Sequence, residues 1–124
     1  GHSLGGRMVI KAAQVVGEAG GVPVGRMLAL APAVSRSDVD WTRVRRGSHE
    51  KPEVYFTQKD DVLKTVFSIA EGEWQEAIGY RGAGGDAAEV CSIDAELELG
   101  DGGHGDYAAN LRAVLECSTT SLLG

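Results

Sequence analysis

Long apolar runs and positive charge are both scarce in this sequence. No apolar run approaches the roughly 18 residues that a membrane-spanning helix needs, so no transmembrane segment is expected. The formal net charge is -6, and the only dense basic stretch consists of Arg43, Arg45 and Arg46. Because that stretch is too small for a nucleic-acid-binding surface, we expect no nucleic-acid partner.

Cysteine is also scarce, since Cys91 and Cys117 are the only two. Their spacing is not that of a metal site, and neither His2 nor His49 has a second ligand residue at a suitable spacing. We therefore expect no metal, and we interpret His2 and His49 as local packing or surface residues. Two cysteines fit reduced thiols at least as well as a disulfide, which slightly favours the cytoplasm and leaves the compartment open.

Internal repeats are lacking, although glycine is frequent. The 18 glycines mark breaks between segments and form no regular period. The chain has 124 residues, of which 43% are hydrophobic and 24% are charged. This composition is typical of one globular domain.

The spacing of apolar residues predicts helices that alternate with strands. Residues 27–31 form a continuous apolar run, as in a strand buried on both faces, and residues 53–57 have the β-branched and aromatic content of a second strand. Residues 91–99 alternate between apolar and polar as in a half-exposed strand near an edge. Residues 62–70 have helical spacing. Two further helices are expected from residues that share a helical face: Met8, Ala12, Val15 and Val16 in the first, and Tyr107, Leu111, Val114 and Leu115 in the last.

The segment 33–52 does not fit this alternation. It is polar and charged, with the single tryptophan Trp41, and it is long for a simple connection. We therefore expect a lid-like or mobile loop without fixed structure.

Strands that alternate with helices predict an α/β fold with a parallel sheet, and sites in such sheets form beyond the carboxyl ends of the strands. Ser3, His104 and one of Asp60 and Asp61 all fall at such ends. Ser3 lies in the sequence "GHSLGG", where Gly1, Ser3 and Gly5 form the pattern G-x-S-x-G. This pattern can present a serine as a nucleophile on a sharp turn between a strand and a helix.

These motifs resemble the carboxyl-terminal half of an α/β-hydrolase, beginning at the nucleophile elbow. "GHSLGG" is similar to the elbow of esterases and lipases, "TQKDDVL" to the acid-bearing turn, and "GGHGDY" to the histidine loop before the final helix. The resemblance implies that residues 1–124 are the carboxyl-terminal portion of a single α/β-hydrolase domain. About three strands of a mostly parallel sheet, flanked by helices, would be present, and the amino-terminal half of the sheet would be missing.

The resemblance implies a serine hydrolase, of the carboxylesterase or lipase-like kind, that acts on a small-molecule ester or related acyl substrate without a cofactor. Ser3 would be the nucleophile, His104 the general base, and the Leu4 amide one oxyanion-hole donor. The loop that normally supplies the second donor is absent, so the isolated chain is expected to hydrolyse esters poorly or to aggregate. The alternative is a non-catalytic binding module or a truncated remnant of this fold.

Two neighbouring aspartates compete for the role of the triad acid. Asp61 directly precedes Val62, where the helical face begins, so Asp61 is free to cap that helix. Asp60 is then left at the end of the strand, from which it can reach His104, and we favour Asp60. We also expect that a side chain in place of Gly1 or Gly5 would crowd the sharp turn.

Overall fold

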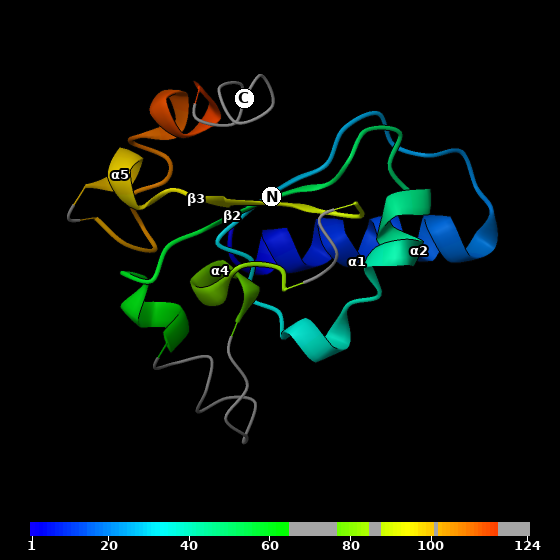
Figure 1. Cartoon of the computed structure of the whole chain (residues 1–124), viewed down its shortest axis with the longest axis horizontal. Coiled ribbons are helices and arrows are strands. Elements are labelled where there is room, and N and C mark those ends of the chain that lie inside the picture. Colours follow the sequence, from blue (N-terminus) through cyan, green and yellow to red (C-terminus); the bar gives the residue numbers. More distant parts are fainter. Residues whose placement is uncertain (65–76, 85–87, 101, 117–124) are drawn as a thin grey trace.

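The structure is a computed structural model, and it describes residues 1–64, 77–84, 88–100 and 102–116. Its centre is a parallel sheet of three strands in the order β1-β2-β3, where β1 is Leu28–Leu30, β2 is Glu53–Phe56 and β3 is Cys91–Asp94. Helices flank this open sheet (Figure 1). The expected α/β class with a parallel sheet is therefore confirmed.

The first residues of the chain extend the sheet beyond β1. His2 forms a parallel bridge with Leu30. The Leu30 amide donates to the Gly1 carbonyl at 2.8 Å, and the Ser3 amide donates to the Leu30 carbonyl at 2.9 Å. Residues 1–3 thus lie beside β1 and end at the same edge of the sheet.

Both faces of the sheet are covered. Ala29 and Val54 face a core shared with the first two helices, which includes Ile10 and Val44. Tyr55 and its neighbours face the second core. In Figure 1, α1 and α2 lie on one side of the sheet, and the helical residues 111–116 (orange to red) lie on the other.

The first helix, α1 (Leu4–Ala19), lies where it was expected but turns a different face to the core. Its buried residues are Gly6, Ile10 and Ala13, whereas Met8 and Val15 are 72% and 61% exposed. The expected face was therefore wrong. The small residues Gly6 and Ala13 on the buried side let α1 approach its neighbours closely. The spacing of apolar residues alone does not predict that this side is the buried one. The exposed side borders a groove of about 380 Å³ between α1 and β1.

The close approach of α1 to α2 (Trp41–Arg46) depends on two glycines. A Cβ atom at Gly17 would overlap the carbonyl oxygen of Arg43, and one at Gly47 would overlap the carbonyl oxygen of Ala13. Both obstacles are backbone atoms, which cannot move aside as a flexible side chain can. Any larger residue at either position would therefore force the two helices apart.

Residues 33–52 differ from the expectation of a segment without fixed structure. They contain a short 3-10 helix, η1 (Arg36–Asp38), and α2, which begins after Asp40 with the Asp40 carboxylate accepting from the Arg43 amide at 3.2 Å. Trp41 and Val44 are buried, and the Trp41 indole donates to the Ala83 carbonyl at 3.3 Å. These two apolar residues, three apart, are enough to fix a short helix against α1.

The expected strand 91–99 is shorter than its alternating pattern suggests. β3 ends at Asp94, and α5 (Glu96–Leu99) follows, so the strand prediction was wrong beyond Asp94. The Asp94 carboxylate accepts from the Glu96 amide at 2.9 Å and so starts the turn into α5. β3 does lie at an edge of the sheet, as expected.

The remaining helical segments are short. α4 (Ile78–Arg81) contacts β2, and helical turns occur at 61–64 and 111–116. Of the expected last helical face, Tyr107 and Val114 are buried, but Leu111 and Leu115 are partly exposed. The rest of the expected helix 62–70 and Cys117 lie outside the described residues.

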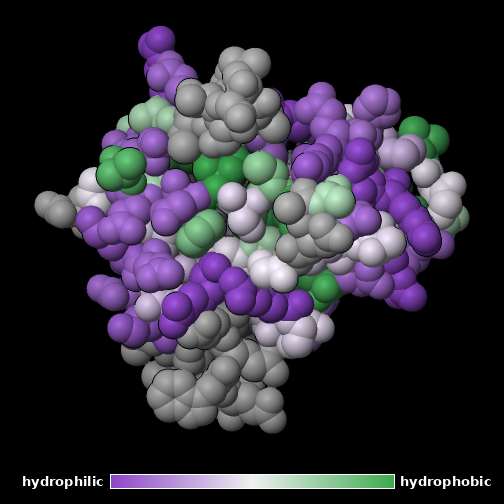
Figure 2. All heavy atoms as spheres, viewed as in Figure 1, coloured by the Kyte–Doolittle hydropathy of each residue, from purple (hydrophilic) through white to green (hydrophobic). Residues whose placement is uncertain are grey.

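On the face of the molecule shown in Figure 2, hydrophobic residues form small separate groups between hydrophilic ones.

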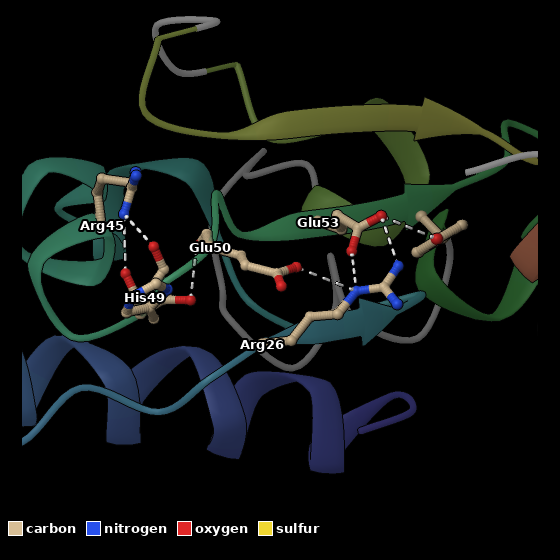
Figure 3. A network of polar contacts seen from close by, with 7 residues as sticks. Arg26, Arg45, His49, Glu50 and Glu53 are labelled. Atoms are coloured by element: carbon tan, nitrogen blue, oxygen red, sulfur yellow. Dashed lines mark hydrogen bonds and ion pairs between the residues drawn. The ribbon is translucent and has the colours of Figure 1, made fainter. Parts of the chain in front are cut away.

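A partly buried ion pair joins the amino ends of β1 and β2 (Figure 3). Arg26 donates to both carboxylate oxygens of Glu53, at 2.8 and 3.3 Å, and this pairing raises the pKa of Arg26. Nearby, the Arg45 guanidinium donates to the backbone carbonyls of Ser48 and His49. This network lies at the strand starts, whereas Ser3, Asp60 and His104 follow strand ends.

Candidate active site

The structure brings Ser3, Asp60 and His104 together at the carboxyl edge of the sheet, from three separate parts of the chain. Ser3 ends the segment beside β1 and directly precedes α1. Asp60 closes a turn after β2, with its amide donating to the Thr57 carbonyl at 3.2 Å. His104 lies in the glycine-rich loop that follows α5.

Two short hydrogen bonds connect these three side chains. His104 Nε2 lies 2.8 Å from Ser3 Oγ, and His104 Nδ1 lies 2.7 Å from Asp60 Oδ2. An ionised carboxylate can only accept, so we assign the ring proton of His104 to Nδ1. Nε2 is then the acceptor for the Ser3 hydroxyl, which is the arrangement that a general base needs.

Ser3 has the backbone conformation of a sharp, strained turn. Its φ is 55° and its ψ is -119°, in a region that residues other than glycine rarely occupy. Hydrogen bonds hold this conformation: the Ser3 carbonyl accepts from the amides of Arg7 and Ala33, both at 3.1 Å. The surrounding backbone thus fixes the direction of the Ser3 side chain.

The glycines around Ser3 only partly match the expectation. A Cβ at Gly1 would overlap the carbonyl of Gly5, which agrees with the expected crowding. A Cβ at Gly5 would meet nothing within 4 Å, so crowding at that position was a wrong prediction. The tight position is Gly6, where a Cβ would lie 3.0 Å from Pro32. The segment after β1 passes over Gly6, a contact that the pattern G-x-S-x-G does not reveal.

Asp60, not Asp61, faces His104, but the physical reason for expecting this was wrong. We expected Asp61 to cap the following helical turn. In the structure the cap is Asp60 itself, whose Oδ1 accepts from the Leu63 amide at 2.9 Å while Oδ2 faces His104. Asp60 is fully buried and Asp61 is exposed. One carboxylate therefore serves both the helical turn and the histidine.

The loop around His104 is closed by Asp106. The Gly103 amide donates to the Asp106 carboxylate at 2.8 Å, and the Asp106 amide donates to the Gly103 carbonyl at 3.1 Å. Gly103 is required there because a Cβ would lie 2.9 Å from the Lys59 carbonyl. This contact sets the His104 loop directly against the Asp60 turn, and the His104 side chain is only 14% exposed.

The structure places two residues at the site that the sequence analysis did not assign to it, His2 and Tyr107. The Nε2 atom of His2 lies 2.7 Å from the His104 carbonyl, although His2 was interpreted as a packing or surface residue. Tyr107 is buried, and its hydroxyl has no hydrogen-bond partner among the described residues. Burial, with the nearby charges of Asp60 and Asp94, raises the pKa of Tyr107. For His2, the signal in the sequence was its position directly before Ser3.

The amide of Leu4, the expected oxyanion donor, directly follows Ser3 at the start of α1. Leu4 is the first residue of the 16-residue helix α1, and the first amides of a helix have no acceptor within it. The positive end of the helix dipole also lies there, next to Ser3. A negative oxygen that forms beside Ser3 Oγ would therefore meet a hydrogen-bond donor and a favourable field.

Within the described parts of the chain, no group of three His, Cys, Asp or Glu residues could hold a metal ion. No helix among those residues is long and apolar enough to cross a membrane. Cys91 is a free thiol there, and burial raises its pKa.

None of the compared family models, curated proteins and solved structures matches this chain, so the functional interpretation depends on the geometry of Ser3, His104 and Asp60.

Proposed function

We propose that this protein is a serine hydrolase of the α/β-hydrolase type, which transfers the acyl group of a carboxylic ester or related compound to water. The observation that supports the proposal is the continuous hydrogen-bonded series from Ser3 through His104 to Asp60, with distances of 2.8 and 2.7 Å. Such a series activates an otherwise weakly nucleophilic hydroxyl.

The reaction would proceed in two halves. Ser3 Oγ attacks the ester carbonyl carbon while His104 Nε2 takes the hydroxyl proton. The tetrahedral intermediate then expels the alcohol, which receives that proton from His104, and an acyl-serine remains. In the second half, water attacks the acyl carbonyl carbon while His104 Nε2 takes one of its protons. The second tetrahedral intermediate then breaks its bond to Ser3 Oγ, which receives that proton from His104, and the acid leaves.

The other groups at the site would lower the energy of charged states along this path. The Asp60 carboxylate stabilises the imidazolium of His104 and keeps its proton on Nδ1. The Leu4 amide would donate to the tetrahedral oxyanion. Each such donor contributes about 10²- to 10³-fold in rate, and Leu4 is the one donor that we assign, so we expect modest turnover.

A purely structural role explains less of the geometry. Capping by Oδ1 accounts for the burial of Asp60, but it does not require Oδ2 to face a histidine ring. A non-catalytic binding module likewise does not require the positive φ of Ser3, because strain of this kind persists only where the surroundings impose it. The hydrolase accounts for both observations at once.

The direct test is hydrolysis of a short-chain p-nitrophenyl ester, followed by the release of p-nitrophenolate. We expect release above the buffer rate, with an initial burst of up to about one equivalent of product if loss of the acyl group from Ser3 is the slower half.

The matched control is His49→Ala, which removes an exposed imidazole beside Arg45, in the segment that precedes β2 (Figure 3). It should leave the burst and the later steady phase unchanged. Release no faster than in buffer alone, from protein that unfolds cooperatively, would contradict the proposal.

A further inference from the structure

His2 connects the nucleophile turn to the loop that carries His104. Its backbone is bridged to Leu30 in the sheet, and its Nε2 lies 2.7 Å from the carbonyl oxygen of His104. The centroid of its ring lies 4.9 Å from that of His104 and 5.7 Å from that of Tyr107, and both pairs of rings are tilted. One exposed side chain therefore contacts the backbone and the ring of His104 and the buried ring of Tyr107.

The chemistry of this contact fixes the role that His2 can have. A backbone carbonyl only accepts, so Nε2 of His2 must carry a proton, in the neutral ring or in the imidazolium. Both ring nitrogens of His104 are already used, by Ser3 and Asp60. His2 thus acts on the backbone of His104 and has no place in the proton transfer.

The loop that holds His104 has few side chains of its own for anchoring. Gly102, Gly103 and Gly105 surround His104, and the contacts between Gly103 and Asp106 are internal to the loop. The Lys59 ammonium holds the start of the loop through the Gly100 carbonyl at 2.9 Å. Among the described residues, His2 makes the hydrogen bond to the backbone of His104 itself.

We propose that His2 is a positioning residue, which holds the His104 loop so that Nε2 stays within hydrogen-bonding distance of Ser3 Oγ. This inference rests on the proposed hydrolase function. His2 and Ser3 are adjacent, so the contact ties the base to the same short segment as the nucleophile. A displacement of about 1 Å at a reacting group can lower the rate by about 10²-fold, so even a partial shift of His104 should be measurable.

The test compares two substitutions of His2 that distinguish the effect of its ring contacts from the effect of its N–H donor. His2→Phe keeps the ring contacts with His104 and Tyr107 but removes the N–H donor, and we expect kcat to fall about 10-fold with KM within about twofold. His2→Gln restores a side-chain N–H donor, and we expect kcat within about threefold of the unmodified protein. His49→Phe is the control for a histidine lost elsewhere.

A second measurement does not depend on activity. The proton shared by His104 Nδ1 and Asp60 Oδ2 in their 2.7 Å hydrogen bond is expected to give a separate downfield signal in the proton NMR spectrum, and this signal would report the position of the His104 ring. It should shift or broaden in His2→Phe and should be retained in His2→Gln. His2→Ala also removes the donor, so it replaces His2→Phe if that variant does not fold.

Two results would overturn the inference. One is a kcat and a downfield signal in His2→Phe that equal those of the unmodified protein. The other is an equal loss in His2→Phe and His2→Gln, which would assign the effect to packing and not to the hydrogen bond. If the unmodified protein hydrolyses no ester, the proposed function fails, while the NMR comparison still decides whether His2 positions His104.

Discussion

Replacement of Ser3 by alanine is expected to lower the rate of ester hydrolysis to about the rate in buffer alone, because the groups of a triad act as a unit and none replaces the nucleophile. The substitution removes one oxygen and keeps the Cβ, so the unusual φ of 55° is no more strained in the variant. The melting temperature should therefore stay close to that of the unmodified protein. The measurements are kcat on a short-chain p-nitrophenyl ester and a thermal melt.

Ser37→Ala is the matched control for loss of a hydroxyl. Ser37 lies in η1, where its hydroxyl shares a 2.9 Å hydrogen bond with Ser35. This variant should keep its full activity. Turnover in Ser3→Ala within about tenfold of the unmodified protein would remove Ser3 from the mechanism, since loss of a nucleophile has a far larger effect.

Asp60→Asn is expected to lower kcat by about 10⁴-fold with little change in substrate binding. The amide group of the variant can turn its NH₂ toward His104 Nδ1. That contact favours the ring form that carries its proton on Nε2, which can no longer accept from Ser3. The amide oxygen can still accept from the Leu63 amide at the cap, so the melting temperature should change little.

Two companion variants separate catalysis from capping. Asp61→Asn alters the exposed neighbour and should leave kcat within about twofold of the unmodified value, since the carboxylate that faces His104 is that of Asp60. Asp60→Ala should lose both the rate and about 1 kcal/mol of stability, because it also removes the cap. A large loss of turnover in Asp61→Asn, with an active Asp60→Asn, would reverse the assignment.

The order of elements could be predicted from the sequence where apolar residues were dense. Residues 27–31 and 53–57 contain β1 and β2, and the alternating stretch after Cys91 contains β3. The position of Ser3, Asp60 and His104 at one edge followed from the rule that parallel strands end together. Their mutual distances did not follow, because they depend on how the turns after β1 and β2 pack.

The failures of prediction have physical causes. α1 has apolar residues on more than one side, and the contacts of Gly6 and Gly17 with other segments decide which side is buried. α2 is fixed by only two buried residues, which are too few for a periodic pattern. The alternation beyond Asp94 continues through a helix, where the Asp94 carboxylate and not apolar spacing sets the boundary.

The site also contains two sets of side-chain contacts that the sequence pattern did not predict. Asp60 uses one oxygen for the helical turn and the other for His104, whereas the sequence pattern predicted a separate aspartate for each task. His2 contacts His104, which lies 102 residues further along the chain, through a backbone carbonyl. The contacts of Asp60 and His2 with His104 join segments that are far apart in the sequence, so their presence depends on the folded positions of those segments.

The central claim is that Ser3 is an activated nucleophile, and covalent labelling with a fluorophosphonate probe tests it most directly. The probe phosphonylates a serine only when a neighbouring base activates the hydroxyl. We expect one adduct per chain, located on Ser3 by peptide mass spectrometry, and much slower labelling of Asp60→Asn. A protein that melts cooperatively but forms no adduct, or forms it on a serine other than Ser3, would contradict the claim.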